Sequence, residues 1–550
     1  MKITLSQLSF HTGNFAGNTD KIISSIESAK QEGSGLIVFS ELATCGYPAR
    51  DFLAFQDFIN QAENSIQKIA NHCRGIAAIV GSPRPNLISK GKALFNSAYF
   101  LADGKIAHIT DKTLLPNYDI FDEYRYFEPN KQFEIINYQG FKIALTICED
   151  LWNIVENPQY PNTPMDELIL QNPDFIINIA ASPFSKTQIA ERKQVLTQNA
   201  TLYKLPIFYV NHIGAQTHLI FDGGSCVFNA AGNIFQELAY FKEDTQSFEV
   251  EKTADLLQIF GSNQNHNIPR NKYEDIENAL VLGIRQYFQK LGFKQAILGL
   301  SGGVDSALVS YLACEALGKE NVWAILLPSQ FSSQHSIDDS IQLAQTLGIK
   351  YDIMPIENTF QSFLNTLSPF YKDSAFGLAE ENLQSRTRGV LLMGLANKFG
   401  HILLNTSNKS ELAVGYGTLY GDMCGGISVI GDLYKTEIYA LCDYINRTKE
   451  IIPNNILTKA PSAELRPDQK DSDSLPPYEI LDAILHQYIE EENGPSQIIE
   501  AGFDSNLVQR ILRMVNMNEW KRWQAPPVLR LSKKAFGPGR RVPISGKYLS

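Results

Sequence analysis

Residues 299–318 read GLSGGVDSALVSYLACEALG, and this stretch decides the fold of the second half of the chain. It begins at the end of a short apolar segment, Gln295–Leu300, which we expect to form a strand, and it continues into a helix predicted over Ser306–Leu317. Gly302 and Gly303 allow backbone N–H groups to approach an anion closely, and a helix amino terminus favours negative charge. The stretch therefore predicts a strand, a phosphate-binding turn and a helix.

This turn differs from other glycine-rich phosphate loops. No Gly-Lys-Ser/Thr follows the glycines, as a Walker A loop requires, and the GxGxxG spacing is absent. Ser301 and Ser306 offer hydroxyl donors, and Asp305 offers an oxygen ligand that suits magnesium. The alternative is a glycine-rich strand–helix turn that binds nothing.

Strands and helices alternate downstream of the turn. An entry helix is expected at 274–291, strands at 322–327, 351–356 and 401–405, and helices at 336–347 and 378–399. This alternation is typical of a doubly wound parallel sheet.

The first half of the chain also predicts an α/β domain. Short apolar runs alternate with amphipathic segments, of which 18–31, 55–72 and 190–202 are the clearest helices. Strands with helices outside them imply layers. The stretch 251–271 is rich in Gly, Asn and Pro and reads as a linker. We therefore expect domains at 1–250 and 272–550, joined by a linker at 251–271.

Composition narrows the class of protein. The chain has 550 residues, of which 44% are hydrophobic, and 48 basic against 59 acidic residues give a net charge of −11. That charge argues against broad nucleic-acid binding. The seven cysteines form no CxxC pair, which makes a zinc site or disulfide scaffold unexpected. With no apolar run long enough to cross a bilayer, we expect a soluble, cytoplasmic protein without a membrane partner.

Three ionisable residues follow predicted strands of the first half. Glu41 lies in GLIVFSELATCGYPARD, Lys112 in KIAHITDKTLLPNYDIF and Cys148 in FKIALTICEDLW. Ligands of open α/β sheets sit beyond the carboxyl ends of the strands. There, a carboxylate could take the thiol proton, an ammonium could stabilise an oxyanion, and the thiolate could attack a carbonyl. The alternative is an inert buried cysteine and two solvated loop charges.

The segments FSELATCGYPARD, DKTLLPNYDIFDEYRYF, ICEDLW, NIAASPF and GAQTHLIFDGGS resemble the nitrilase, or carbon–nitrogen hydrolase, superfamily. The resemblance implies an α-β-β-α layered fold and an amide-hydrolysing triad of Glu41, Lys112 and Cys148. It also implies that Tyr118 and Ser182 hold glutamine. Gln188 stands where many relatives carry a lysine, and Lys186 is shifted from that place, so the third glutamine contact stays open.

The SGGVDS string resembles the N-type ATP pyrophosphatases, which cleave ATP between its α- and β-phosphates. The segments EENLQSRTRGVLLM, NTSNKSELAVGYGTLYGDMCGG, GDLYKTEIYAL and KAPSAELRPDQKDSDSLPPYE resemble the NAD synthetase family along the second half. With the amidase-like half in front, the chain resembles the members of that family that take nitrogen from glutamine.

This second resemblance implies a set of binding residues. ATP contacts are expected at Gly299, Leu300, Ser301, Gly302, Gly303, Val304, Asp305, Ser306, Thr406, Lys435 and Ser462. Magnesium ligands are expected at Asp305 and Glu411, and contacts to deamido-NAD at Asn382, Arg386, Glu411, Asp422 and Lys534. Arg388 lies about half a turn further round the same predicted helix. It is expected either to contact a different phosphate or to lie on the solvated surface. Lys534 belongs to a tail without acidic residues after Glu519. Such a tail suits phosphates, and the alternatives are a solvated basic end or an arm that binds nucleic acid.

The expected reaction is the ATP-dependent amidation of deamido-NAD to NAD, with glutamine as nitrogen donor and AMP, pyrophosphate and glutamate as the other products. Magnesium is the expected cofactor. Because ammonia released into neutral water becomes ammonium, we also expect an enclosed passage between the domains. The resemblance further implies a homo-oligomer built through the synthetase domains.

Three alternatives stay open at this point. One is another amidotransferase with the same phosphate loop, such as a GMP-synthetase-like protein, although that enzyme uses an unrelated Cys–His–Glu glutaminase. Another is a catalytically silent binding or regulatory protein. The third is an amidase whose second domain takes no part in the reaction.

Overall fold

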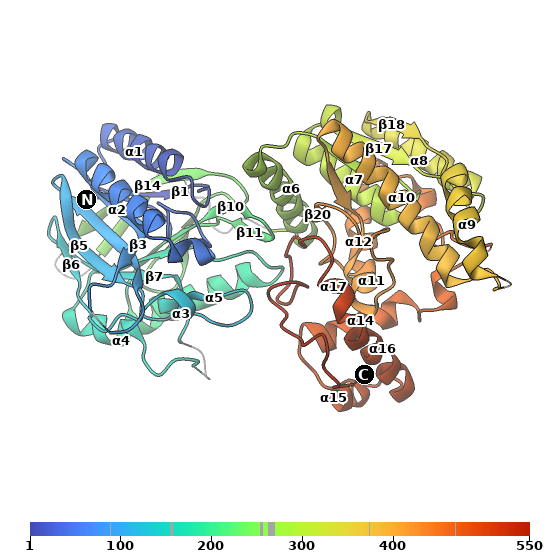
Figure 1. Cartoon of the computed structure of the whole chain (residues 1–550). Coiled ribbons are helices and arrows are strands. Elements are labelled where there is room, and N and C mark those ends of the chain that lie inside the picture. The colour runs from blue at the N-terminus through green and yellow to red at the C-terminus, as the bar shows by residue number, and fades with distance from the viewer. Residues whose placement is uncertain are drawn as a thin grey trace. The chain divides into compact units, whose positions relative to one another are not determined.

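The computed structural model describes residues 1–88, 90–154, 158–253, 257–261, 270–372, 374–467 and 469–549. The chain divides into two compact units, Met1–Arg270 and Asn271–Ser550 (Figure 1). We call them unit 1 and unit 2.

Unit 1 contains two large sheets and a small hairpin. The seven-stranded sheet has the order β15-β14-β1-β2-β3-β4-β5. Its strands are β1 (Lys2–Gln7), β2 (Leu36–Val38), β3 (Ala77–Pro85), β4 (Leu94–Ala102), β5 (Lys105–Asp111), β14 (Asp244–Lys252) and β15 (Leu257–Gly261). The six-stranded sheet has the order β13-β12-β9-β8-β7-β6. Its strands are β6 (Ile136–Tyr138), β7 (Phe141–Ile147), β8 (Phe175–Ala180), β9 (Ile207–Asn211), β12 (Cys226–Phe228) and β13 (Ile234–Glu237). The hairpin pairs β10 (Ile213–Gln216) with β11 (Leu219–Asp222).

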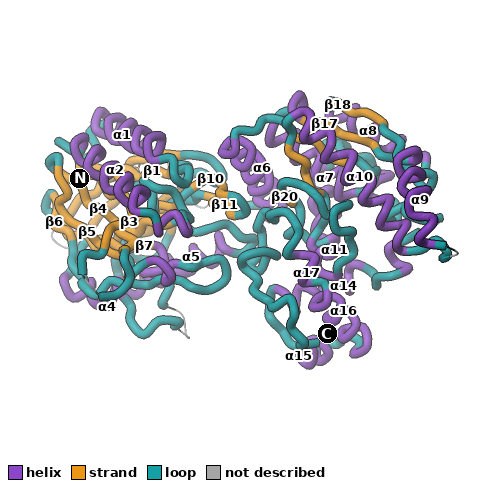
Figure 2. The backbone as a smooth tube through the Cα atoms, viewed as in Figure 1, coloured by secondary structure: helices purple, strands orange, loops and turns teal. Residues whose placement is uncertain are grey.

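In unit 1 the strands lie between helices (Figure 2). The alternation of side chains along the strands explains these layers. Leu36 and Val38 of β2 point into a core shared with Ile143 and Leu145 of the other sheet, so the two sheets pack face to face. Ile37, between them, packs instead with the helices α1 (Phe15–Gln31) and α2 (Gln56–His72). The helices α4 (Pro164–Leu168) and α5 (Gln188–Tyr203) cover the outer face of the six-stranded sheet. The expected α-β-β-α arrangement is thereby confirmed.

Short helical segments complete unit 1. They are η1 (Arg50–Ala54), α3 (Glu123–Tyr126), η2 (Cys148–Leu151) and η3 (Ile169–Gln171).

Part of the expected linker belongs to the sheet instead. Residues 251–252 end β14, and 257–261 form β15, which pairs with β14 in antiparallel register. Ile259, opposite Val250, packs against the shared core, so a strand forms here despite the flanking Gly and Asn residues. Residues 254–256 and 262–269 of the expected linker lie outside the described residues.

Unit 2 contains a five-stranded parallel sheet with the order β18-β17-β16-β19-β20. Its strands are β16 (Ala296–Gly299), β17 (Val322–Leu326), β18 (Lys350–Ile353), β19 (Ile402–Asn405) and β20 (Ile427–Ser428). The order reverses between β16 and β19. In doubly wound sheets, ligands bind at the carboxyl ends of the strands on either side of such a reversal. The predicted doubly wound sheet is confirmed.

Helices surround this sheet in Figure 1. They are α6 (Lys272–Leu291), α7 (Val304–Leu317), η4 (Lys319–Asn321), α8 (Gln334–Leu347), α9 (Glu357–Tyr371), α10 (Leu378–Phe399), α11 (Lys409–Val414), α12 (Lys435–Ile445), α13 (Asn454–Thr458), η5 (Asp471–Asp473), α14 (Tyr478–Ile489), α15 (Pro495–Glu500), α16 (Ser505–Met517) and α17 (Glu519–Arg522). The helices α11, α14 and α16 share a second apolar core. Within the residues that the structure describes, no helix is both long and apolar enough to cross a membrane.

Candidate active sites

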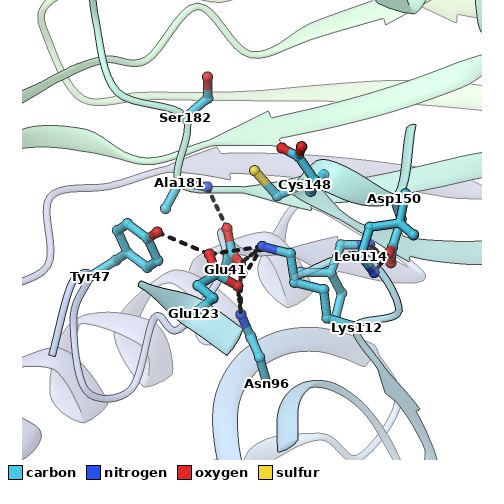
Figure 3. Close-up of polar contacts among 12 residues, drawn as sticks. Glu41, Tyr47, Asn96, Lys112, Leu114, Glu123, Cys148, Asp150, Ala181 and Ser182 are labelled. Atoms are coloured by element: carbon cyan, nitrogen blue, oxygen red, sulfur yellow. Dashed lines mark hydrogen bonds and ion pairs between the residues drawn. The ribbon is translucent and has the colours of Figure 1, made fainter. Parts of the chain in front are cut away.

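The structure brings Glu41, Lys112 and Cys148 together in unit 1 (Figure 3). Lys112, fully buried, donates from Nζ to Glu41 Oε1 at 2.7 Å. Glu41 also accepts bonds from Asn96 Nδ2 at 2.7 Å and from the Ala181 backbone N–H at 3.0 Å. The carboxylate is thereby fixed from three elements of the fold.

Cys148 is the first residue after β7 and has a φ of 46°, in the left-handed region. The Asp150 carboxylate holds this turn, because it accepts a bond from Ile147 N at 3.0 Å. Its other oxygen accepts bonds from Thr113 N at 3.0 Å and Leu114 N at 2.8 Å. Asp150 therefore ties the turn that carries Cys148 to the segment that carries Lys112.

The charges around Cys148 set its protonation. Burial and the Glu41 carboxylate raise the pKa of the thiol well above its ordinary value, and Lys112 only partly opposes them. Burial alone would lower the pKa of the Lys112 ammonium, but the Glu123 and Glu41 carboxylates raise it. The resting cluster is thus a neutral thiol beside a permanent cation, and attack by sulfur requires a base to take the thiol proton.

Glu123 is a member of this cluster that the sequence analysis missed. It lies on α3 and accepts bonds from Lys112 Nζ at 2.9 and 2.8 Å and from the Tyr47 hydroxyl at 2.9 Å. Burial raises the pKa of Glu123 despite the neighbouring ammonium. Glu123 lies in the segment DKTLLPNYDIFDEYRYF, but nothing in the spacing separates it from the neighbouring acids Asp119 and Asp122.

The three expected glutamine contacts lie around the same cysteine. The Tyr118 hydroxyl donates to Glu149 Oε1 at 2.9 Å, and Glu149 directly follows Cys148. Ser182 follows Ala181, the residue that bonds Glu41, and its Oγ accepts from Gln188 Nε2 at 3.4 Å. Glu149, a buried carboxylate that Tyr160 also contacts at 3.2 Å, is a second residue that the sequence analysis did not single out.

Unit 2 holds a cavity of about 540 Å³ at the carboxyl ends of the parallel strands. Fourteen of the expected binding residues line it, namely Gly299, Leu300, Ser301, Gly302, Gly303, Val304, Asp305, Ser306, Asn382, Thr406, Glu411, Asp422, Lys435 and Ser462. The cavity therefore lies where the order of the sheet reverses, beside β16 and β19.

The loop between β16 and α7 depends on glycine. Gly302 has a φ of +78°, and a Cβ there would lie 2.4 Å from the Ser336 carbonyl oxygen. Ser306 Oγ accepts a bond from Ser301 N at 3.2 Å, which shapes the turn from within. The loop thus opens the amino terminus of α7 toward the cavity.

Asp305, Glu411 and Lys435 form a charged group on the cavity wall. Lys435 Nζ lies 2.5 Å from Asp305 Oδ2 and 3.5 Å from Glu411 Oε1. Burial raises the pKa of Glu411; Lys435 opposes the shift, and Asp305, Asp471 and Asp422 add to it. One ammonium therefore faces a surplus of carboxylates. Among the described residues, no group of three or more His, Cys, Asp or Glu side chains is arranged to hold a metal.

Two expected contacts lie off the cavity wall. Arg386 donates from Nε to the Leu419 carbonyl at 3.2 Å, and Lys534 pairs with Glu492 at 3.0 Å. Lys521 lines the cavity instead and donates to the carbonyls of Gly415 at 2.8 Å and Gly417 at 3.0 Å. Lys521 is the first cation of the acid-free tail, but sequence alone does not rank the cations of that tail.

Comparison with known proteins matches both units. Residues 2–255 match the family model of carbon–nitrogen hydrolases, and residues 276–525 match that of NAD synthases. A glutamine-dependent NAD(+) synthetase of Synechocystis is 44% identical over 99% of both chains. Another, from Thermotoga maritima, is 39% identical and covers 100% of this chain and 99% of its own.

A solved structure is similar over the same length. The glutamine-dependent NAD+ synthetase of Acinetobacter baumannii, determined in complex with ADP, is 38% identical with a TM-score of 0.77. The match covers 99% of this chain and 98% of the Acinetobacter baumannii chain. These matches favour neither a GMP-synthetase-like protein nor an amidase with an unrelated second domain. The chain belongs to the glutamine-dependent NAD(+) synthetase family.

Proposed function

We propose that this chain makes NAD by transferring the amide nitrogen of glutamine to deamido-NAD, with ATP converted to AMP and pyrophosphate. One observation carries the proposal: a single chain holds a buried carboxylate–ammonium–thiol cluster in unit 1 and a phosphate-loop cavity in unit 2. The first arrangement suits the release of ammonia from an amide, and the second suits the activation of an acid.

In unit 1, Cys148 Sγ attacks the side-chain carbonyl of glutamine while Glu41 takes the thiol proton. Lys112, held between Glu41 and Glu123, stabilises the oxyanion as it forms. Glu41 then gives the proton to the departing ammonia, and a water molecule, deprotonated by Glu41, hydrolyses the thioester to glutamate. Tyr118, Ser182 and Gln188 orient glutamine through neutral hydrogen bonds, since Gln188 supplies an amide where a lysine is common.

In unit 2, an oxygen of the nicotinate carboxylate attacks the α-phosphorus of ATP, and pyrophosphate leaves. A free carboxylate is a poor electrophile, so the acyl-adenylate is what allows ammonia to attack the carbonyl carbon and displace AMP. The loop from Gly299 to Ser306 holds the ATP phosphates, with Thr406, Lys435 and Ser462 as further contacts. Asn382, Asp422 and Lys521 hold the dinucleotide.

Magnesium fits the charged group of the cavity. Asp305 and Glu411 supply the hard carboxylate oxygens that this ion prefers, and their surplus of negative charge is what a divalent cation would offset. We propose these two residues as its protein ligands, with phosphate and water oxygens as the others. When bound, the ion neutralises charge on the ATP phosphates.

Assembly and location belong to the same proposal. A homo-oligomer formed through unit 2 is part of the proposal, as the resemblance to the family implies. In such an oligomer, Arg386 and Lys534 could serve a neighbouring copy's dinucleotide. The seven cysteines are all free, which supports a cytoplasmic location.

A pyrophosphate-release assay tests the proposal. Purified protein receives ATP, magnesium and deamido-NAD, with either glutamine or ammonium as nitrogen donor. We expect one pyrophosphate and one NAD per turnover with either donor, and no NAD when deamido-NAD is replaced by xanthosine monophosphate. Release of pyrophosphate with xanthosine monophosphate but not with deamido-NAD would overturn the proposal.

A further inference from the structure

Four cationic side chains line the cavity of unit 2 within the described part of the chain: Arg388, Lys435, Lys459 and Lys521. Two of them have carboxylate partners. Lys435 pairs with Asp305 and Glu411, and Lys459 pairs with Glu464 at 2.8 Å. Arg388 and Lys521 have no carboxylate within ion-pair distance among the residues that the structure describes. An anion supplied by a ligand would complete their surroundings.

Of these two cations, Arg388 is the stronger candidate for a contact to an anionic ligand. Its Nε donates to the carbonyl oxygen of Leu327, just beyond β17, at 3.0 Å. A guanidinium has five N–H donors, so this single bond fixes the position of Arg388 and leaves the other four donors for the cavity. Burial lowers the pKa of Arg388 to about 10, although Glu464 and Asp422 oppose the shift. The group is thus a largely buried cation that forms no direct ion pair within the described residues, although Glu464 and Asp422 act on it from a greater distance.

The surroundings of Arg388 place it between two regions of the cavity. Leu392, one turn further along α10, would lie 3.3 Å from a Cβ at Gly299, the first residue of the phosphate loop. On the side of β17, the wall is formed by apolar residues that suit a base: Ile325, Leu326 and Pro328. The loop on the other side suits the leaving pyrophosphate. The ATP group that lies between the adenosine and the pyrophosphate is the α-phosphate.

We propose that Arg388 binds the α-phosphate of ATP and keeps hold of it through the acyl-adenylate to AMP. This inference rests on the proposed function. As the substrate carboxylate forms its bond to the α-phosphorus, the bond from that phosphorus to the bridging oxygen of pyrophosphate breaks. A planar guanidinium can hold two non-bridging oxygens throughout this exchange. When ammonia later attacks the acyl carbon and loses a proton, AMP leaves still paired with Arg388.

The test compares two ligands that differ only in the α-phosphate. Calorimetry measures the affinities of AMP and adenosine for the wild-type chain and for Arg388→Met. In the wild type, AMP should bind about ten to a hundred times more tightly than adenosine, as expected for charged hydrogen bonds. In Arg388→Met this preference should fall to about twofold or less, while adenosine affinity stays unchanged, because only the phosphate contact is lost.

A second variant and a matched control keep the test decisive. Arg388→Lys, which keeps the charge without the planar fork, should retain part of the preference for AMP. Arg285→Met is the control, since Arg285 also bonds backbone carbonyls, those of Ala316 and Glu315, but does not line the cavity. It should keep the full preference. If the wild-type chain makes NAD but both Arg388 variants keep the wild-type ratio of AMP affinity to adenosine affinity, this inference alone is overturned. A wild-type chain that makes no NAD would overturn the proposed function, and the inference with it.

Discussion

Cys148 is held in a backbone conformation that a residue with a side chain seldom adopts. Its φ of 46° places the thiol beyond the end of β7, where Glu41 and Lys112 converge (Figure 3). Left-handed residues at such positions cost energy that the surrounding bonds must offset. Here the Asp150 carboxylate supplies them through bonds to Ile147, Thr113 and Leu114.

The protonation of Cys148 leads to a prediction on pH. Because burial and Glu41 raise the pKa of the thiol, the thiol is protonated over the neutral range, and its thiolate fraction grows as pH rises toward that pKa. Alkylation of Cys148 by iodoacetamide should therefore accelerate steadily from about pH 6 to about pH 9 without a plateau. Peptide mass spectrometry separates Cys148 from the partly exposed Cys314 and Cys424. A plateau below about pH 8 would mean that a preformed thiolate exists, against this account.

The limits of prediction from sequence are clearest at single residues. Glu41, Lys112 and Cys148 could be recognised because each follows a predicted strand in a distinctive motif. Glu123 and Lys521 could not, because their places depend on tertiary folding: α3 turns Glu123 back onto Lys112, and α17 brings Lys521 to the Gly415 and Gly417 carbonyls. Local sequence does not indicate such tertiary contacts.

Among elements, the parallel strands were the easiest to predict. Strands such as β16 and β17 are buried on both faces and therefore appear as continuous apolar runs between helices. Strand β15 was missed because only alternate side chains pack and its flanks carry Gly and Asn. The irregular segment after α17 could not be predicted at all, since buried polar contacts rather than periodicity hold it.

That segment is anchored by one aspartate. Asp432 accepts bonds from Leu531 N, Ser532 N and Ser532 Oγ, each at 2.7 Å, and pairs with buried Lys409 at 2.8 Å. Asp432→Ala should lower the free energy of unfolding by about 3–5 kcal/mol, because Lys409 loses a buried partner and the segment loses its acceptors. Urea unfolding measures the loss, and hydrogen exchange should accelerate at residues 529–533.

Asp443→Ala is the control for this element. Asp443 is exposed on the neighbouring helix α12, and its removal should change stability by less than about 0.5 kcal/mol. Equal losses in the two variants, or unchanged exchange at 529–533 in Asp432→Ala, would contradict the anchoring role.

At the scale of the whole molecule, each unit has its own apolar cores and its own site. The cores around β2 and β7 belong to unit 1, and those around α14 and β16 belong to unit 2. A change at the thiol should therefore leave the phosphate-loop cavity intact. The two halves of the proposed reaction can be separated experimentally in the intact chain for this reason.

Cys148→Ala performs that separation. Without the sulfur no thioester can form, so glutamine should no longer support NAD synthesis, whereas added ammonium should support it within about twofold of the wild-type rate. Cys226→Ala, another buried cysteine of unit 1, should retain both activities because its side chain only packs in the core. NAD formation is followed with each nitrogen donor, and circular dichroism verifies folding. Loss of both activities in folded Cys148→Ala would mean that ammonia cannot reach the acyl-adenylate without a working unit 1, and the division of labour between the two sites would have to be abandoned.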